Sequence, residues 1–464
     1  MSSFASVPAG VSLGAVGGIG PPRLSLFFSD EELKSMASEE AVSASLGKMG
    51  GLGYSFGYSR TPKLYRVLSS HPKYLEMELK SYDMVFRGDG PLPLTWRNYI
   101  AIMAASRYNC EYLVHMHRRQ FLANGGDPSW LKGLSHAPKK LTRLQSINAI
   151  LAHRPWLINK DDIGALTEEG SATFSVSEVL LAICIMSIVH SHAGFVLGMG
   201  LCLEPEDVEG DEGSGTSASP PRAKSRKIRP TAIGQGGDGG GAGGAPGTNG
   251  DFDDAEIFQR LGYDIEKLIE DDDTREEDVF EQVEGAIQIK QEKQQLSDLS
   301  VYCGDDQLDY EDYSVKDQGM LKSQEFSWVE QCHALLGRYY PDLADHFDEQ
   351  FEFTYEMTYN TFGDKKTEKK TDAFRQAVWY YVHRLVGICN DDYEYRQVNL
   401  FLTRPIKEYT KTVCCFPETV VEEDFEKFSS SITVGEKCHV NLLILEARKQ
   451  AELIYGIRAI TGKR

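Results

Sequence analysis

The chain has 464 residues, of which 41% are hydrophobic and 25% charged, proportions typical of a protein with apolar cores. At about 150 residues per domain, this length predicts two or three domains. Asp and Glu total 69 against 49 Lys and Arg, a net charge of −20. This charge disfavours a nucleic-acid binder, because phosphate contacts need a positive field.

Residues 1–24 are rich in Gly, Ser, Ala and Pro, with no basic residue before Arg23, so we expect a disordered N-terminus and no secretory signal. Residues 25–202 form a predicted N-terminal helical domain. Apolar side chains recur there every three to four residues, which predicts helices over 96–122, 141–153 and 176–189. The apolar stretch 179–189 has eleven residues, whereas a transmembrane helix needs about 20. We therefore expect a buried helix and no membrane insertion.

Residues 203–323 form a predicted acidic, Gly-rich linker with 30 acidic and 12 basic residues, which leaves the rest of the chain nearly neutral. Its Gly-rich part, 204–250, has no aromatic residue and cannot bury enough apolar surface to fold. A basic island at 222–229 is either a nuclear-localisation or anionic-surface patch, or a solvated stretch of the linker, which is the commoner case.

Residues 324–464 form a predicted C-terminal helical domain, with helices over 373–388 and 440–460. Strand-like alternation is scarce. The sequence therefore predicts an all-α fold of two helical-bundle halves joined by a long acidic disordered linker.

Nine cysteines are scattered along the chain without a C-x-x-C pair. A disulfide framework or a four-cysteine zinc site would need closer pairing, so we expect a reducing compartment, the cytoplasm or also the nucleus. Neither a metal site nor a cofactor is expected.

Cys110 and His117 lie seven residues apart on the predicted helix that runs to Leu122, so both side chains share one face. A nearby His can take the thiol proton and leave the reactive thiolate. Tyr112 points about 200° away from Cys110 on an ideal helix. The competing interpretation is a buried core cysteine, which is the commoner situation. A complete thiol cycle would also need a distant cysteine or an external thiol.

Several long motifs follow one another in an order that resembles the sestrin family, over roughly 80–202 and 325–464. They are GDGPLP at 88–93, YIAIMAA at 99–105, CEYLV at 110–114, GGDP at 125–128, INAILAHRPWLI at 147–158, TYNT at 358–361, DDY at 391–393, KTVC at 411–414, HVNLL at 439–443, EAR at 446–448 and RAIT at 458–461. The resemblance implies a stress-induced, all-helical protein whose halves are similar to the alkyl-hydroperoxidase D fold. It also implies a leucine sensor that binds the GATOR regulatory complex and restrains TOR signalling when leucine is low.

The resemblance assigns three groups of residues. The peroxide-reducing residues map onto Cys110, Tyr112 and His117; the leucine site onto Thr358, Tyr359, Thr361, Thr371, Arg375, Glu436 and His439; and the partner-binding residues onto Asp391, Asp392 and Ser191. The alternatives are helix caps or surface ion pairs for the leucine residues and a solvated loop for the acidic pair.

The proposed leucine residues also make chemical sense, because a free amino acid needs a carboxylate for its ammonium group and cationic or backbone donors for its carboxylate. Arg375 beside a helix that starts at Thr371 suits the ligand carboxylate, and Glu436 with His439 suits the ammonium. Two departures from the family weaken this match. The spacing from Thr358 to Thr371 is one residue longer, and Ser429, next to Phe428, replaces the expected lid aromatic.

From the sequence we therefore expect a leucine-responsive inhibitor of TOR signalling. The alternative is a thiol-dependent alkyl hydroperoxide reductase centred on Cys110, and a third possibility is a binding scaffold without either chemistry.

Overall fold

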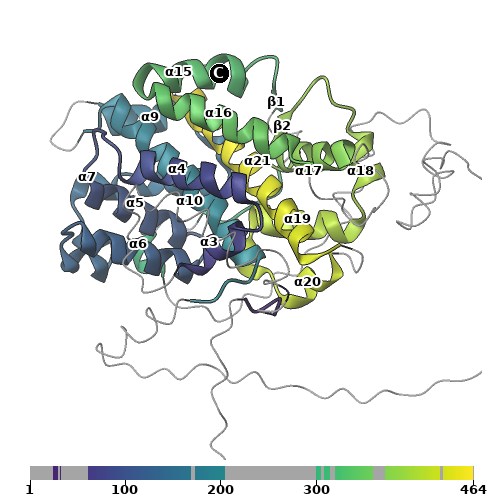
Figure 1. Cartoon of the computed structure of the whole chain (residues 1–464). Helices are drawn as coiled ribbons and strands as arrows, with labels where there is room; N and C mark the ends of the chain where they lie inside the picture. The colour runs from purple at the N-terminus through teal and green to yellow at the C-terminus, as the bar shows by residue number, and fades with distance from the viewer. Residues whose placement is uncertain are drawn as a thin grey trace, which may run out of the picture.

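The computed structural model in Figure 1 describes residues 25–29, 32, 61–168, 173–203, 299–304, 308–313, 319–358, 371–428 and 432–462. The N-terminal segment 1–24 and the basic island at 222–229 lie outside these residues. The regular secondary structure of the described residues is helical apart from two strands of two residues each. The prediction of an all-α fold is confirmed.

The N-terminal half consists of helices joined by short turns. Their bounds are α3 (Lys63–Leu68), α4 (Pro72–Phe86), α5 (Leu94–Ser106), α6 (Glu111–Ala123), η2 (Pro128–Lys132), η3 (Leu134–His136), α7 (Lys139–Thr142), α8 (Gln145–His153), η4 (Pro155–Leu157), α9 (Lys160–Thr167) and α10 (Val176–Gly198). Capping boxes at Asn159 and Ser175 begin α9 and α10, because each side chain bonds a backbone N–H that the first helical turn leaves without a partner.

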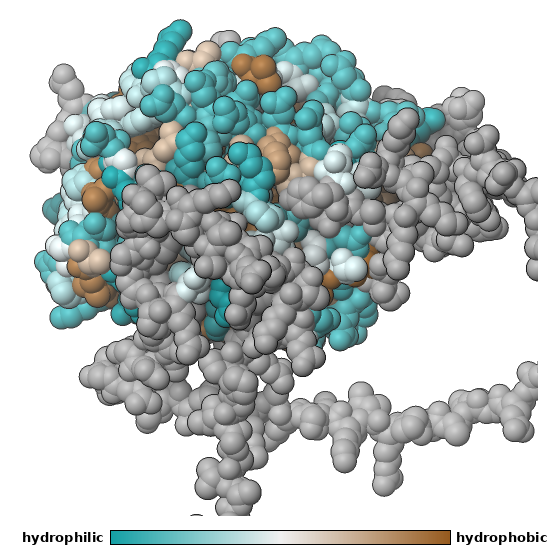
Figure 2. Space-filling model, in the orientation of Figure 1, coloured by the Kyte–Doolittle hydropathy of each residue, from teal (hydrophilic) through white to brown (hydrophobic). Residues whose placement is uncertain are grey.

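The C-terminal half adds a second set of helices and a small parallel strand pair. Their bounds are η6 (Ser300–Tyr302), β1 (Leu321–Lys322), η7 (Trp328–Cys332), α15 (His333–Tyr339), α16 (Pro341–Glu356), α17 (Thr371–Leu385), β2 (Ile388–Cys389), α18 (Arg396–Phe401), α19 (Arg404–Cys415), η9 (Pro417–Thr419), α20 (Glu422–Lys427) and α21 (Val434–Thr461). The face over α15 and α16 is mostly hydrophilic in Figure 2, as expected for outer helices that bury one side only.

Helices α10 and α21 pass through the middle of the molecule and pack against each other (Figure 1). One contiguous apolar core runs through both halves around them. The close approach of α10 to α21 and to α19 depends on glycine. A Cβ on Gly456 of α21 would lie 2.6 Å from Ile183 Cγ2 of α10, and one on Gly194 of α10 would lie 2.9 Å from the Val413 carbonyl oxygen of α19. The two halves therefore share a core.

Among the described residues, α10 is the one helix long and apolar enough to cross a membrane, and its apolar window is wholly buried inside the protein. The prediction of a buried helix is confirmed. The helix continues past its predicted end at 189 because buried carboxylates satisfy the polar side chains that follow. His190 Nδ1 lies 2.9 Å from Glu452 Oε2, and His192 Nε2 lies 3.0 Å from Glu78 Oε1.

The predicted single helix over 96–122 is wrong, because α5 ends at Ser106 and α6 starts at Glu111. Between them Asn109 has a φ of 49°, a left-handed conformation that Asn tolerates better than most residues. The Cys110 amide then donates to the Ala105 carbonyl. Asn109 was the sequence signal for this break. Cys110 is consequently the N-cap residue of α6 and not an interior helical residue.

The structure also differs from the expected linker at its C-terminal end. Residues 299–304, 308–313 and 319–323 have defined positions. The Tyr302 hydroxyl donates to the Leu131 carbonyl at 2.6 Å, and β1 pairs with β2. The aromatic side chains that 204–250 lacks are present here, so this part of the chain can bury apolar surface.

The glycine contacts predict opposite effects for two alanine substitutions. Gly194→Ala should lower the free energy of unfolding by about 1–3 kcal/mol, because the new methyl group meets a rigid backbone carbonyl. Gly164→Ala, inside α9, should raise it by about 0.5–1 kcal/mol, because its Cβ would meet only Glu168 Oε1, at 3.5 Å. Urea unfolding followed by circular dichroism measures both. Changes of the same sign would contradict the packing.

Candidate functional site

The first turn of α17 carries a buried cation. Arg375 is 4% exposed, and its Nη1 donates to Thr371 Oγ1 at 2.6 Å while Nε donates to the Tyr355 carbonyl at 3.0 Å. Its Nη2 forms an ion pair with Asp372, whose side chain is 57% exposed. The guanidinium therefore lies at a helix start, where the backbone N–H groups add further positive potential.

The first turn of α21 carries the matching carboxylate. Thr433 and Glu436 form a capping box, in which Glu436 Oε2 accepts from the Thr433 amide at 2.8 Å and Thr433 Oγ1 accepts from the Glu436 amide at 3.3 Å. Glu436 is 6% exposed. Such a carboxylate is held in one orientation by its own helix.

His439 lies one turn further along α21 and is fully buried. Burial, with the positive charge of Arg375 and the neighbouring His71, holds its pKa well below the usual value. The His71 ring lies 5.5 Å from it in an edge-on arrangement, and burial lowers the pKa of His71 to about 3. Both imidazoles are thus neutral at physiological pH, so they act as hydrogen-bonding groups and not as cations.

The charge of Arg375 reaches His439, Thr371 contacts Arg375, and Glu436 lies one turn before His439 on α21. These four predicted leucine residues therefore lie at the starts of two neighbouring helices. Arg375 with the α17 terminus can receive a carboxylate, and Glu436 can receive an ammonium group. Sequence reasoning missed His71 and Tyr355. No local signal marks either residue, because they reach the site from the N-cap of α4 and from α16 through tertiary packing.

The remaining predicted leucine residues are placed differently. Thr358 is exposed just after α16, and Tyr359, Thr361 and Ser429 lie outside the described residues. Phe428 is buried, with its ring 4.7 Å from that of Tyr409. It is therefore part of the core beside α19 and does not present an exposed lid.

The predicted partner-binding residues separate into a surface pair and an interior residue. Asp391 and Asp392 are surface residues in the turn after β2, where the Asp392 amide donates to Asn390 Oδ1. The Asp391 side chain is 19% exposed and lies 3.7 Å from Lys322. Ser191 is buried in α10 and donates to the Ser187 and Ile188 carbonyls of its own helix. The acidic pair can meet a partner directly, whereas Ser191 cannot while α10 is covered.

The predicted peroxide-reducing residues lie in the N-terminal half, and each is buried. Burial raises the pKa of Cys110 to about 12 and lowers that of His117 to about 3. His117 Nδ1 lies 3.1 Å from Asn98 Oδ1, and the Tyr112 hydroxyl accepts from the Leu64 amide. In this arrangement Cys110 is held as a thiol, which is the unreactive form.

This raised pKa predicts slow alkylation of Cys110 in the folded chain. At pH 8, iodoacetamide should label it at least about 100-fold more slowly than the half-buried Cys202 and Cys389, because only the thiolate reacts. Its rate should still rise about tenfold per pH unit between pH 8 and pH 10. Mass spectrometry of digested protein gives the labelling rates. Equal labelling of the three cysteines would contradict a buried Cys110 that is held as the thiol.

The same burial predicts that Cys110→Ser leaves peroxide consumption unchanged. A loss of consumption in this variant, with the fold intact, would instead support alkyl hydroperoxide reduction at Cys110.

Comparison with known proteins identifies the family. The family model described as "PA26 p53-induced protein (sestrin)" matches residues 24–463. Human Sestrin-2 is 35% identical over 462 residues, covering 95% of this chain and 91% of that protein. Xenopus laevis Sestrin-1 is 35% identical over 461 residues (96% and 92%), and a Dictyostelium discoideum sestrin homolog is 34% identical over 463 residues (94% and 76%). The chain belongs to the sestrin family.

Proposed function

We propose that this sestrin is a stress-responsive leucine sensor, which negatively regulates TOR complex signalling by binding the GATOR regulatory complex when leucine is low. The observation that carries the proposal is that the buried Arg375 at the start of α17 lies close enough to His439 of α21 for its charge to lower the pKa of that imidazole, with the buried Glu436 one turn before His439. This arrangement offers a cation and a carboxylate to the two charged ends of an amino acid.

Asp372 provides the anionic partner of Arg375 when no leucine is bound. Its carboxylate is mostly exposed, yet it pairs with the buried guanidinium of Arg375. A leucine carboxylate would compete for the same nitrogen, because a buried guanidinium needs an anionic partner. Asp372, which can turn toward solvent, would then yield its place at Arg375. The side chain of leucine would be recognised by apolar contacts, which distinguish aliphatic chains only modestly.

The proposal predicts selective stabilisation by leucine. At about 100 times its Kd, leucine should raise the free energy of unfolding by about 2.7 kcal/mol, and this gain should disappear in Glu436→Gln. The matched control is Glu178→Gln, which removes the corresponding capping-box carboxylate from α10. Asp372→Asn should strengthen leucine binding by removing the competing anion. Thermal-shift titrations with leucine and isoleucine measure these effects.

Two results would count against the sensor: no stabilisation at millimolar leucine, or an equal loss of the leucine-dependent stabilisation in Glu436→Gln and Glu178→Gln.

The exposed acidic pair predicts a separate effect on partner binding. Asp391→Ala with Asp392→Ala should abolish capture of the GATOR complex from leucine-free lysate and leave leucine stabilisation unchanged, because neither residue belongs to the α17–α21 site. The control is Glu422→Ala with Glu423→Ala, another exposed acidic pair. Equal capture by both double variants would refute a specific role for the residues after β2.

A further inference from the structure

A short acidic segment lies across both halves of the protein. Residues 308–313 read Leu-Asp-Tyr-Glu-Asp-Tyr, and we call them the strap. The Leu308 carbonyl accepts from Arg107 Nη2 at 2.8 Å, and the Asp309 carbonyl accepts from Arg154 Nε at 2.8 Å. These two arginines hold the strap backbone on the N-terminal half.

The strap carboxylates pair with cations from both halves. Glu311 lies 2.9 Å from Arg154 Nη2, and Asp312 lies 2.8 Å from Lys411 Nζ of α19. The Lys411 side chain is only 4% exposed, whereas that of Asp312 is 68% exposed. An ammonium group withdrawn from water this far is costly without an anion beside it. The face beneath the strap therefore favours a carboxylate at this position.

The two strap tyrosines occupy defined positions on the same face. The Tyr310 ring lies edge-on to Phe416, 5.4 Å away, and the Tyr313 ring lies 5.3 Å from that of Trp156. Gly387 makes room for the second ring, since a Cβ there would lie 2.4 Å from Tyr313 Cε2. Its φ of +78° further favours glycine. The face beneath the strap thus accommodates two aromatic rings from residues three positions apart.

The strap is held by few backbone interactions. It forms neither helix nor strand, and its contacts to the body include two carbonyls, two carboxylates and two rings. One of its two ion pairs, Arg154–Glu311, is partly solvated on both sides and contributes little. A tethered segment with such contacts occupies its site mainly because the tether gives it a high effective concentration.

We propose that the face beneath the strap binds a partner's peptide of the same chemistry, with two aromatic side chains three residues apart among carboxylates, and that the strap is a competing intramolecular ligand. The residues of this strap-binding face are Arg107, Arg154, Trp156, Gly387, Lys411 and Phe416. This site shares no residue with the α17–α21 site, so the inference does not rest on leucine sensing.

The experiment uses the full chain with residues 308–313 replaced by a Gly-Ser segment of equal length. A fluorescein-labelled peptide with the sequence of the strap should bind this variant, and the intact chain should bind it at least about tenfold more weakly, because its own strap competes. Adding Lys411→Ala to the replaced chain should weaken binding by at least about tenfold. Adding Lys427→Ala, which removes an exposed cation on α20, should leave binding unchanged. Fluorescence anisotropy measures all four.

Three results would overturn the proposal. The first is that the strap-replaced chain folds but does not bind the peptide at 1 mM, on the order of a tether's effective concentration. The second is that a peptide with the same residues in scrambled order binds equally well, and the third is that the intact protein has twice the mass of one chain because the strap of a second copy fills the face.

A measurement on the intact chain covers the case in which the replaced chain does not fold. Tyr310 lies against Cys415, so displacement of the strap by added peptide should speed alkylation of Cys415, read by mass spectrometry. No change in rate at saturating peptide would overturn the proposal.

Discussion

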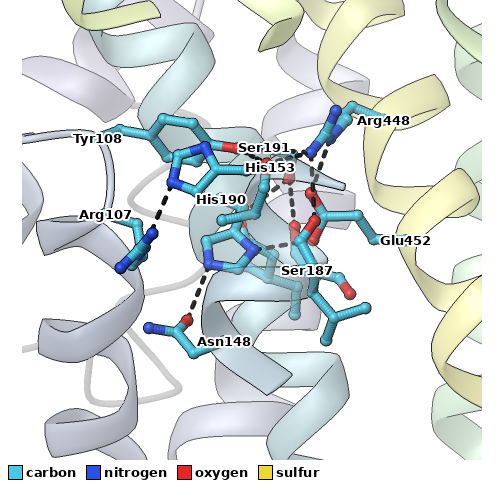
Figure 3. A network of polar contacts seen from close by, with 12 residues as sticks. Arg107, Tyr108, Asn148, His153, Ser187, His190, Ser191, Arg448 and Glu452 are labelled. Carbon is cyan, nitrogen blue, oxygen red and sulfur yellow. Dashed lines mark hydrogen bonds and ion pairs between the residues drawn. The ribbon is translucent and has the colours of Figure 1, made fainter. Parts of the chain in front are cut away.

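Two ion pairs on α21 lie wholly inside the protein, Arg448–Glu452 at 2.7 Å and Lys449–Glu446 at 2.7 Å. Each is completed by the N-terminal half. Arg448, drawn beside Glu452 in Figure 3, donates to the Ala152 carbonyl at 2.6 Å, and the Tyr74 hydroxyl donates to Glu446 at 2.6 Å. Removing one partner of such a pair leaves a buried charge, at a cost of about 3–5 kcal/mol. The position of α21 along its neighbours is therefore closely constrained.

This constraint positions the residues that matter for function. Glu436 and His439 are on the first turn of the helix whose middle carries the buried charges. With α21 held against α4, α8 and α10, its N-terminal turn meets His71 from the first half and Arg375 from the second. The candidate leucine site is thus a product of the contact between halves. Neither half alone contains all of its members.

The strap-binding face depends on the same contact. Arg107 donates to His153 Nε2 at 3.3 Å at the outer edge of the network in Figure 3, and it also holds the strap. The other side of the face comes from α19, whose Val413 carbonyl packs closely against Gly194 of α10. Both candidate sites therefore combine cations and carboxylates contributed by segments distant in sequence.

Local patterns in the sequence determined the all-α fold, the burial of α10 and the pairing of Thr371 with Arg375, because helical periodicity and spacings of four residues act within one turn. Tertiary structure decided the rest. Exposure and pKa depend on what packs against a side chain, so the sequence could not reveal the protonated Cys110, the interior Ser191, or the meeting of His71 with His439. The strap was hidden for the same reason. Its acidic composition indicated a linker, and only the cations and rings of two separate helical regions make it a bound segment.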